Sequence, residues 1–333
     1  MKRLIILITF LLMCYAVPRA SSAPIEARGA ILMNTKSGSV LYVQSENALI
    51  PPASLTKIMT LYVVMDHLKD GKTALSDKVK ISARAARQPG ARMGLVTGEV
   101  VSLDNLLKGV AVASGNDASV AVAEHVSGTV ESFVKLMNEK AGELGLKNTR
   151  FRNPNGLPAR EQVTTALDML TLSRSYIENH PEALHYHSIL AVTHRKKTTT
   201  NKNPLLSRHP LVDGLKTGWI ESSKHNLITT ANNGDIRLIS VVLGAPTSTD
   251  LTEGSEKLID FGFRTVASGG RVKVKAQLED PLLAKALEEE LSGNAPATAN
   301  IVSALETVSV NPVLPENGVY DKSNDEPRSQ DID

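Results

Sequence analysis

A serine and a lysine stand three positions apart in the stretch PPASLTKIMT, at Ser54 and Lys57. A serine hydroxyl is a weak nucleophile until a base removes its proton, and side chains at i and i+3 of a helix lie within reach of each other. Pro51 and Pro52 place Ser54 at a helix N-terminus, where free backbone N–H groups favour a developing oxyanion. The stretch predicts a nucleophilic serine with a lysine base, if burial and nearby cations keep that lysine partly neutral.

The Ser-x-x-Lys spacing is not specific by itself. The chain repeats it at Ser132 and Lys135, in the middle of a predicted helix and on its exposed side. The interpretation of Ser54 therefore depends on other segments that can supply the remaining groups of an active site.

The first such segment is VASGND, in which Ser114 and Asn116 stand at a break between two helical patterns. A second hydroxyl can relay a proton, and a side-chain amide can orient the amide of a substrate. The structural alternative is that Ser114 is a helix N-cap. Ser-x-Asn also recurs at Ser45, Ser292 and Ser309, so this pattern alone decides nothing.

The second segment is DGLKTGWI, which contains Lys216, Thr217 and Gly218. A strand that presents these residues at the rim of a cleft supplies a cation and a hydroxyl that can bind a substrate carboxylate. The glycine, which has no side chain, allows another backbone segment to approach the strand closely. The alternative is an exposed lysine that protects an edge strand against aggregation.

The elements that must position these residues indicate an α+β fold. Two β-rich runs around a turn predict a hairpin over 29–44, and apolar residues at helical spacing predict a helix over 54–68. Further helical patterns lie at 102–112, 116–127, 130–144, 165–179 and 249–262, and strand patterns at 211–220, 225–232 and 236–246. Strands at both ends with helices between them predict one antiparallel sheet packed on helices, with a mostly helical lobe inserted.

Composition excludes some classes of function. The 333 residues carry 37 Lys and Arg against 35 Asp and Glu, so the formal charge of +2 does not suggest a nucleic-acid partner. Of the eight histidines, the nearest group is His185, His187 and His194, without a recognisable ligand spacing. These histidines are expected at the surface or in support of other residues, and neither a metal nor a cofactor is predicted.

The two ends of the chain are expected to lie outside the catalytic domain. Residues 1–23 combine a basic start, an apolar run and a small-residue cleavage pattern, as in a secretory signal peptide; an uncleaved anchor is the alternative. Cys14 is the only cysteine and lies in that run, so no disulfide is expected. The domain is predicted over 24–265, followed by an extension over 266–333 that is largely a disordered acidic tail.

Ser-x-x-Lys, Ser-x-Asn and Lys-Thr-Gly in this order form the motif set of penicillin-binding proteins and serine β-lactamases. The segments ASLTKIMT, ARMGL, LLKGVAVASGNDASVAVAEHVSG, LGLKNTRFRNPNGLP, VDGLKTG and RLISVVLGAP also resemble the D-alanyl-D-alanine carboxypeptidases of low molecular mass. The resemblance covers about residues 25–265. It implies the β-lactamase/transpeptidase-like fold and an enzyme that removes the terminal D-Ala of peptidoglycan stem peptides through an acyl-serine, with β-lactams as covalent inhibitors.

The resemblance also implies a role for each motif residue. Ser54 is then the nucleophile, Lys57 its base and Ser114 a proton relay, while Asn116 holds the substrate amide. The residues that bind substrate are then Lys216, Thr217, Gly218 and Trp219, with the backbone N–H groups of Ser54 and Trp219 as the oxyanion hole.

Three alternatives stay open at this point. A β-lactamase of class A deacylates with a glutamate in Glu-x-x-Leu-Asn, a segment that is missing between the second and third motifs. Ile220 replaces a threonine common in relatives, and residues 244–254 contain no arginine for the terminal carboxylate, so an endopeptidase is the closer rival. A wall-binding protein without catalysis is the third.

The resemblance bears on localisation as well. Many relatives add a β-rich domain and a basic amphipathic membrane helix at the C-terminus. Here PLLAKALEEEL is amphipathic but acidic, which disfavours docking on anionic lipid. We expect an exported enzyme, periplasmic or associated with the cell wall, without a stable membrane anchor after cleavage of the signal.

Overall fold

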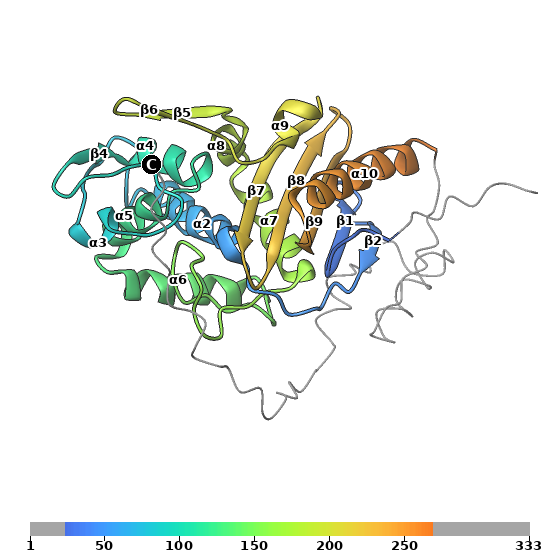
Figure 1. Ribbon diagram of the computed structural model, residues 1–333, viewed down its shortest axis with the longest axis horizontal. Coiled ribbons are helices and arrows are strands. Elements are labelled where there is room, and N and C mark those ends of the chain that lie inside the picture. Colours follow the sequence, from blue (N-terminus) through green and yellow to red (C-terminus); the bar gives the residue numbers. More distant parts are fainter. Residues whose placement is uncertain (1–23, 269–333) are drawn as a thin grey trace, which may run out of the picture.

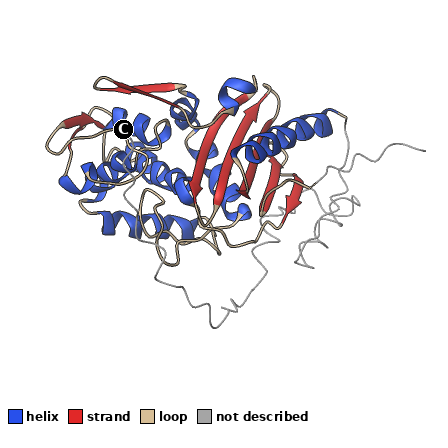
Figure 2. Cartoon of the chain, viewed as in Figure 1, coloured by secondary structure: helices blue, strands red, loops and turns tan. Residues whose placement is uncertain are grey.

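The computed structural model describes residues 24–268, in which a five-stranded antiparallel sheet packs against helices (Figures 1 and 2). The strand order is β2-β1-β9-β8-β7. Strand β1 (Gly29–Asn34), from the start of the domain, pairs with β9 (Arg237–Ala245), from its end. The other three strands are β2 (Val40–Gln44), β7 (Val212–Ile220) and β8 (Lys224–Asn232). The prediction of one sheet built from both ends of the domain is confirmed.

Both faces of the sheet are buried because each strand alternates its side chains between two cores. In β1, Ile31 and Met33 belong to the larger core with the inserted helices, whereas Ala30 and Leu32 face helix α10 (Ser248–Ala267). The period of two in a strand produces this division. Helix α7 (Ala166–Asn179) covers the sheet on the side of the larger core.

The inserted lobe contains the predicted helices. Polar caps mark where helices begin: the hydroxyl of Ser102 accepts a hydrogen bond from Asn105 N at 3.3 Å, and that of Thr129 accepts one from Ser132 N at 3.1 Å. The longer helices of the lobe are α2 (Thr56–Lys69), α4 (Leu103–Ala111), α5 (Asn116–Ser127) and α6 (Val130–Glu143).

Several short elements were not predicted. Two small two-stranded antiparallel sheets lie within the lobe and beside it, where the sequence pattern indicated no strands. Each strand has three or four residues, too few for an alternating pattern to stand out. These elements are β3 (Lys78–Lys80) with β4 (Val100–Ser102), β5 (Ala191–His194) with β6 (Lys197–Thr200), and the short helices η1 (Ala53–Leu55), α3 (Ala83–Ala86), η2 (Pro181–Ala183), α8 (Leu184–Ser188) and α9 (Leu205–Arg208).

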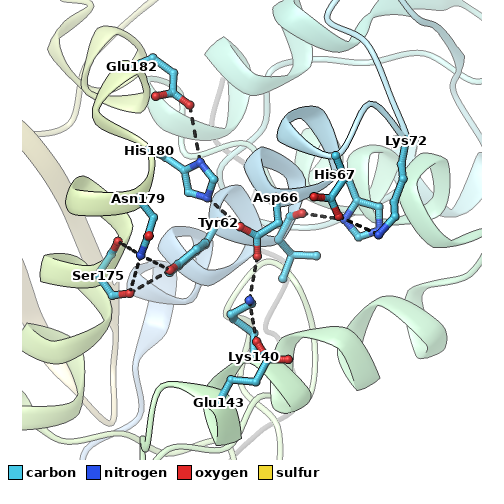
Figure 3. A network of polar contacts seen from close by, with 12 residues as sticks. Tyr62, Asp66, His67, Lys72, Lys140, Glu143, Ser175, Asn179, His180 and Glu182 are labelled. Atoms are coloured by element: carbon cyan, nitrogen blue, oxygen red, sulfur yellow. Dashed lines mark hydrogen bonds and ion pairs between the residues drawn. The ribbon is translucent and has the colours of Figure 1, made fainter.

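A polar network holds the C-terminal end of α2 (Figure 3). The carboxylate of Asp66 lies 2.7 Å from Nε2 of the fully buried His180 and 2.9 Å from Nζ of Lys140, which also pairs with Glu143 at 2.6 Å. Burial raises the pKa of Asp66, but the hydrogen bonds from His180 and Lys140 outweigh it, and the pKa is lowered. The network joins α2 to α6 and to the end of α7, so the far end of the helix that carries Lys57 is held rigidly.

Some predictions fall on residues that the structure does not describe. The expected signal peptide over 1–23, Cys14, and most of the extension over 266–333, with its amphipathic acidic segment, lie outside residues 24–268. Within that described range, none of the helices combines the length and the apolar character needed to cross a bilayer.

Candidate active site

Ser54 lies in the 3-10 turn η1, directly before α2. Pro51 and Pro52 precede this turn, and Ala53 adopts a positive φ of 48°. The sharp turn leaves the Ser54 side chain half-buried, and Lys57 Nζ lies 2.9 Å from Ser54 Oγ. The expected contact across one helical turn is present.

Lys57 is completely buried and makes three contacts through its amine. Nζ lies 2.9 Å from Ser54 Oγ, 2.8 Å from Asn116 Oδ1 and 2.5 Å from the backbone oxygen of Asn155. Burial, followed by the charge of Lys216, holds its pKa well below the ordinary value, against an opposing effect of Asp117. A neutral amine has two N–H groups and one lone pair. The neutral amine of Lys57 can therefore donate to Asn116 Oδ1 and to the backbone oxygen of Asn155, which only accept. Its lone pair can accept a hydrogen bond from the Ser54 hydroxyl.

Ser114 and Lys216 form the opposite side of the site. Lys216 Nζ donates to Ser114 Oγ at 3.0 Å and to the backbone oxygen of Thr217 at 3.0 Å. Burial, aided by the charge of Lys202, lowers the pKa of Lys216 to about 7. Lys216 is only 2% exposed, so the alternative of a protective edge lysine is wrong.

The N-cap alternative for Ser114 is also wrong. The N-cap of α5 is Gly115, without a side-chain cap. Ser114 instead adopts a positive φ of 54° and is 6% exposed in the loop before α5. A non-glycine residue in this conformation is sparsely populated and is held by its surroundings.

Asn116 is held at both ends of its amide. Oδ1 accepts from Lys57, and Nδ2 donates to the backbone oxygen of Pro89 at 2.7 Å. An amide nitrogen has two N–H groups, so one of them is left for a further acceptor. The orientation of the amide is thereby defined before any ligand binds.

The middle of β7 lies against the turn that carries Ser54. A Cβ added to Gly218 would stand 3.1 Å from Ser54 N and 3.2 Å from Pro52 O, so any larger residue would push the strand away from Ser54. Thr217 is half-buried. Trp219 is 55% exposed, with its ring 6.2 Å from that of His225. Glycine at this position allows the close approach that the sequence predicted.

Comparison with known proteins now assigns the family. The family described as D-alanyl-D-alanine carboxypeptidase matches residues 16–247. The chain belongs to this family. It is 41% identical over 256 residues to the D-alanyl-D-alanine carboxypeptidase DacF of Bacillus subtilis and 44% identical over 258 residues to DacC of Escherichia coli. These alignments cover 74% and 75% of the chain, and 64% of each relative, so the chain spans slightly less than two thirds of the relatives' length.

Solved structures of this family share the fold. Penicillin-binding protein 5 of Haemophilus influenzae matches with a TM-score of 0.72 and 39% identity, over 74% of this chain and 73% of that one. Penicillin-binding protein D2 of Listeria monocytogenes, in an ampicillin-bound form, matches with a TM-score of 0.67 and 29% identity, over 73% and 99% of the two chains. The expectation of a β-lactamase/transpeptidase-like α+β fold is confirmed.

Sequence reasoning missed two residues that shape this carboxypeptidase-family site. The backbone oxygen of Asn155 contacts Lys57, and the next residue, Gly156, has a φ of 82°. A Cβ on Gly156 would stand only 1.9 Å from Ala53 O. The pattern of NPNGLP indicates a break between helices, but nothing in it indicates contact with Lys57, 98 positions earlier.

Asp117 is the third residue that was missed. Its buried carboxylate accepts hydrogen bonds from the backbone N–H groups of Met93, Gly94 and Leu95 at 2.8–3.0 Å, and from Ala118 N at 2.9 Å. It thereby holds the ARMGL segment against the start of α5. Its position directly after Asn116 was the available signal.

The remaining candidates lie apart from this site. Lys135 is 79% exposed and pairs with Glu139, and Ser132 hydrogen bonds with Thr129, so the second Ser-x-x-Lys copy forms no pair. His187 is completely buried, and its Nδ1 lies 3.0 Å from the backbone oxygen of Leu215, which makes it a support for β7. Within residues 24–268, His, Cys, Asp and Glu form no group of three arranged to hold a metal.

Proposed function

We propose that this chain is a serine-type carboxypeptidase that removes the terminal D-Ala from peptidoglycan stem peptides through an acyl-serine intermediate. The observation that carries the proposal is the arrangement around Lys57. Its amine faces Ser54 Oγ, while its other two hydrogen bonds go to oxygens of Asn116 and Asn155. In its neutral form, this amine directs a lone pair at the hydroxyl that must lose a proton.

Acylation begins when Lys57 takes the proton of Ser54. The oxygen of Ser54 attacks the carbonyl carbon of the penultimate D-Ala, and the backbone N–H groups of Ser54 and Trp219 stabilise the oxyanion. When the C–N bond breaks, the proton held by Lys57 passes through Ser114 to the amine of the terminal D-Ala, which leaves, and Lys57 is neutral again. Water then adds to the acyl carbon, with Lys57 as base, and the shortened stem is released with Ser54 protonated again.

The substrate carboxylate is proposed to lie against Lys216 and Thr217. Lys216 is held by Ser114 and by the backbone of Thr217, so its charge is fixed in place before a ligand arrives. The free N–H of Asn116 can bind the substrate amide while its other contacts keep Lys57 oriented. No metal or cofactor takes part in these steps.

β-Lactams are proposed to act as covalent inhibitors, because the penicilloyl-serine is expected to be hydrolysed slowly. Both oxygens of Asp117, the carboxylate whose charge acts on Lys57, already accept backbone N–H groups. Asp117 is therefore not free to activate a water molecule. Rapid turnover of nitrocefin would contradict this and would favour a β-lactamase.

An endopeptidase that cuts peptide cross-links is the second candidate. Its support is the absence of arginine in residues 244–254 and the presence of Ile220, which leave recognition of a terminal carboxylate to Lys216 and Thr217. Release of D-Ala from a D-Ala-D-Ala peptide favours the carboxypeptidase. Cleavage of cross-linked dimers without release of D-Ala favours the endopeptidase.

The deciding experiment combines labelling by a fluorescent penicillin with an assay for D-Ala release. Wild type should label and release D-Ala, and Ser54→Ala should do neither. Ser132→Ala, in the second Ser-x-x-Lys copy, is the matched control and should behave as wild type. If Ser54→Ala still labels, the assignment of Ser54 as the nucleophile is wrong; if wild type neither labels nor cleaves, a wall-binding protein without catalysis is favoured.

Export to the periplasm or cell wall is proposed from the signal-peptide pattern of residues 1–23.

A further inference from the structure

Two segments near the site are strongly basic. Residues 78–98 contain no Asp or Glu, and their cations are Lys78, Lys80, Arg84, Arg87 and Arg92. Residues 183–202 also contain no Asp or Glu, and their cations are Arg195, Lys196, Lys197 and Lys202. We call residues 78–98 the lobe arm and residues 183–202 the hairpin arm. The whole chain has a formal charge of only +2, so this clustering is a local feature.

The basic side chains of both arms are exposed. Arg84 pairs with Glu131 at 2.8 Å. The other eight cations make no ion pair with any residue of the described part of the chain. Exposed cations without a partner are available to an external anion.

The hairpin arm is rooted on the strand that carries Lys216. His187 lies 3.0 Å from the backbone oxygen of Leu215, and Asn203, directly after the arm, donates to the backbone oxygen of Gly214 at 3.0 Å. Between these two anchors, hairpin β5–β6 projects from the body of the protein (Figure 1). Lys202 is close enough for its charge to act on Lys216. The basic side chains of this arm therefore begin next to the proposed carboxylate site.

The lobe arm is rooted on the other side of the site. Pro89 O accepts from Asn116 at 2.7 Å, and Gln88 Oε1 accepts from Asn155 at 2.9 Å. The two arms also meet, since His194 lies 3.4 Å from Glu99, directly after the lobe arm. Both arms are thus anchored beside the residues around Ser54, and their exposed cations are together called the basic surface.

We infer that this surface holds a peptidoglycan strand that carries many free carboxylates while one of its stems is processed at Ser54, so that the assembled polymer is the preferred substrate. The inference rests on the proposed function. Each stem that ends in D-Ala-D-Ala has a terminal carboxylate, so a strand is a polyanion whereas a short peptide offers one anion.

Size of the ligand decides the effect of such a surface. At physiological salt, the interaction of exposed charges is screened over about 8 Å, so a lysine on an arm adds little for a small peptide at Ser54. A polymer reaches several cations at once, and its second and later contacts form within one complex. The arms are expected to lower KM for the polymer and to leave acylation by small molecules unchanged.

The test removes charge from each arm without touching the site. The variants are Lys196→Gln with Lys197→Gln, Lys78→Gln with Lys80→Gln, and all four together. The control is Lys36→Gln with Lys257→Gln, which removes two exposed cations from the β1–β2 turn and from α10. Release of D-Ala from insoluble peptidoglycan is compared with release from an N-acylated D-Ala-D-Ala tripeptide, at about 0.05 M and about 0.3 M salt, which spans the range over which screening changes.

We expect the fourfold variant to lose about 10-fold in kcat/KM on the polymer at low salt and less than about 2-fold on the tripeptide and on penicillin acylation. The control should lose less than about 2-fold on every substrate. Equal losses on polymer and tripeptide, or no loss on the polymer, would overturn the inference. So would loss of binding to vesicles of anionic phospholipid with unchanged activity on the polymer, because the surface would then serve a membrane.

Co-sedimentation with peptidoglycan separates this inference from the proposed function. Ser54→Ala should still sediment with the polymer, and adding the fourfold change should release it. If wild type cleaves neither substrate but the fourfold change still abolishes sedimentation, the proposed carboxypeptidase is wrong while the polymer surface stands. If cleavage is normal and sedimentation is unaffected by the fourfold change, only the surface is wrong.

Discussion

Lys216 and Ser114 are 102 positions apart in the chain and meet through a hydrogen bond of 3.0 Å. This contact joins the strand β7 to the loop before α5, and it sets a second buried lysine opposite the pair of Lys57 and Ser54. In the proposed mechanism, Lys57 must be neutral to act as a base, whereas Lys216 must be charged to attract a carboxylate. The charge of Lys216 favours this division, because it adds to burial in lowering the pKa of Lys57.

The pH dependence of kcat/KM should reflect these two lysines. Deprotonation of Lys57, whose pKa is lowered by burial and by the charge of Lys216, should increase activity, and loss of the Lys216 charge above about pH 7 should decrease it. Lys216→Arg keeps its charge at every pH used, so the fall at high pH should disappear even if the maximum is lower. The measurement is D-Ala release from pH 4 to 10, and an unchanged alkaline fall in the variant would contradict the assignment.

Lys216→Met should stabilise the fold and impair the enzyme. The pKa of Lys216 is about 7 in the folded protein, against an ordinary value of 10.5 in the unfolded chain. Between these two pH values the unfolded state binds more protons than the folded state, so the stability of the fold rises with pH. Below about pH 7 the buried charge destabilises fully. At pH 6 the free energy of unfolding of the variant should be higher than that of wild type by roughly 1–3 kcal/mol. Each kcal/mol corresponds to about 2–4 °C in Tm, and the gain should vanish near pH 10.

The control for this stability gain is an exposed lysine. Lys224→Met on β8 removes a charge that pairs with Glu221 at the surface, and its Tm should change little at either pH. Penicillin labelling should fall in Lys216→Met and not in Lys224→Met. A lower Tm for Lys216→Met at pH 6 would show that its hydrogen bonds outweigh its burial.

Asp117→Asn should loosen the site and shift its pH profile. The amide retains one oxygen but turns its NH₂ group toward backbone N–H donors, so we expect a loss of about 2–4 kcal/mol in the free energy of unfolding. Removing the negative charge also lowers the pKa of Lys57 further, so the acid side of the labelling profile should move to lower pH. Urea unfolding and labelling rates measure the two effects, and destabilisation without a shifted profile would leave Asp117 a purely structural role.

Gly156→Ala should abolish labelling through the backbone alone. The added Cβ would stand 1.9 Å from Ala53 O, an atom that moves only if the turn carrying Ser54 moves. Displacement of about 1 Å at the nucleophile is expected to slow labelling by roughly 100-fold. Gly98→Ala is the control, because Gly98 has a similar φ of 84° but no atom within 4 Å of the new Cβ. Equal losses in the two variants would indicate that backbone strain, rather than the collision, is responsible.

The sequence alone was sufficient for the elements with clear periodicity. Helix α2 and strands β1, β7, β8 and β9 fall within a few residues of their predicted ranges, because long apolar patterns reflect which face is buried. The contact between Ser54 and Lys57 was also predictable, since helical geometry brings i and i+3 together without help from the rest of the fold.

Only the tertiary structure decided the environment of those residues. The burial that lowers the pKa of both Lys57 and Lys216 arises from helices and strands distant in the chain. The oxygen of Asn155 reaches Lys57 across 98 positions. The basic arms are separate runs of Lys and Arg in the sequence, and only the fold anchors both of them beside the site. Local spacing therefore determined which two residues form the proposed catalytic pair, whereas long-range packing determined the pKa shifts and the surroundings of that pair.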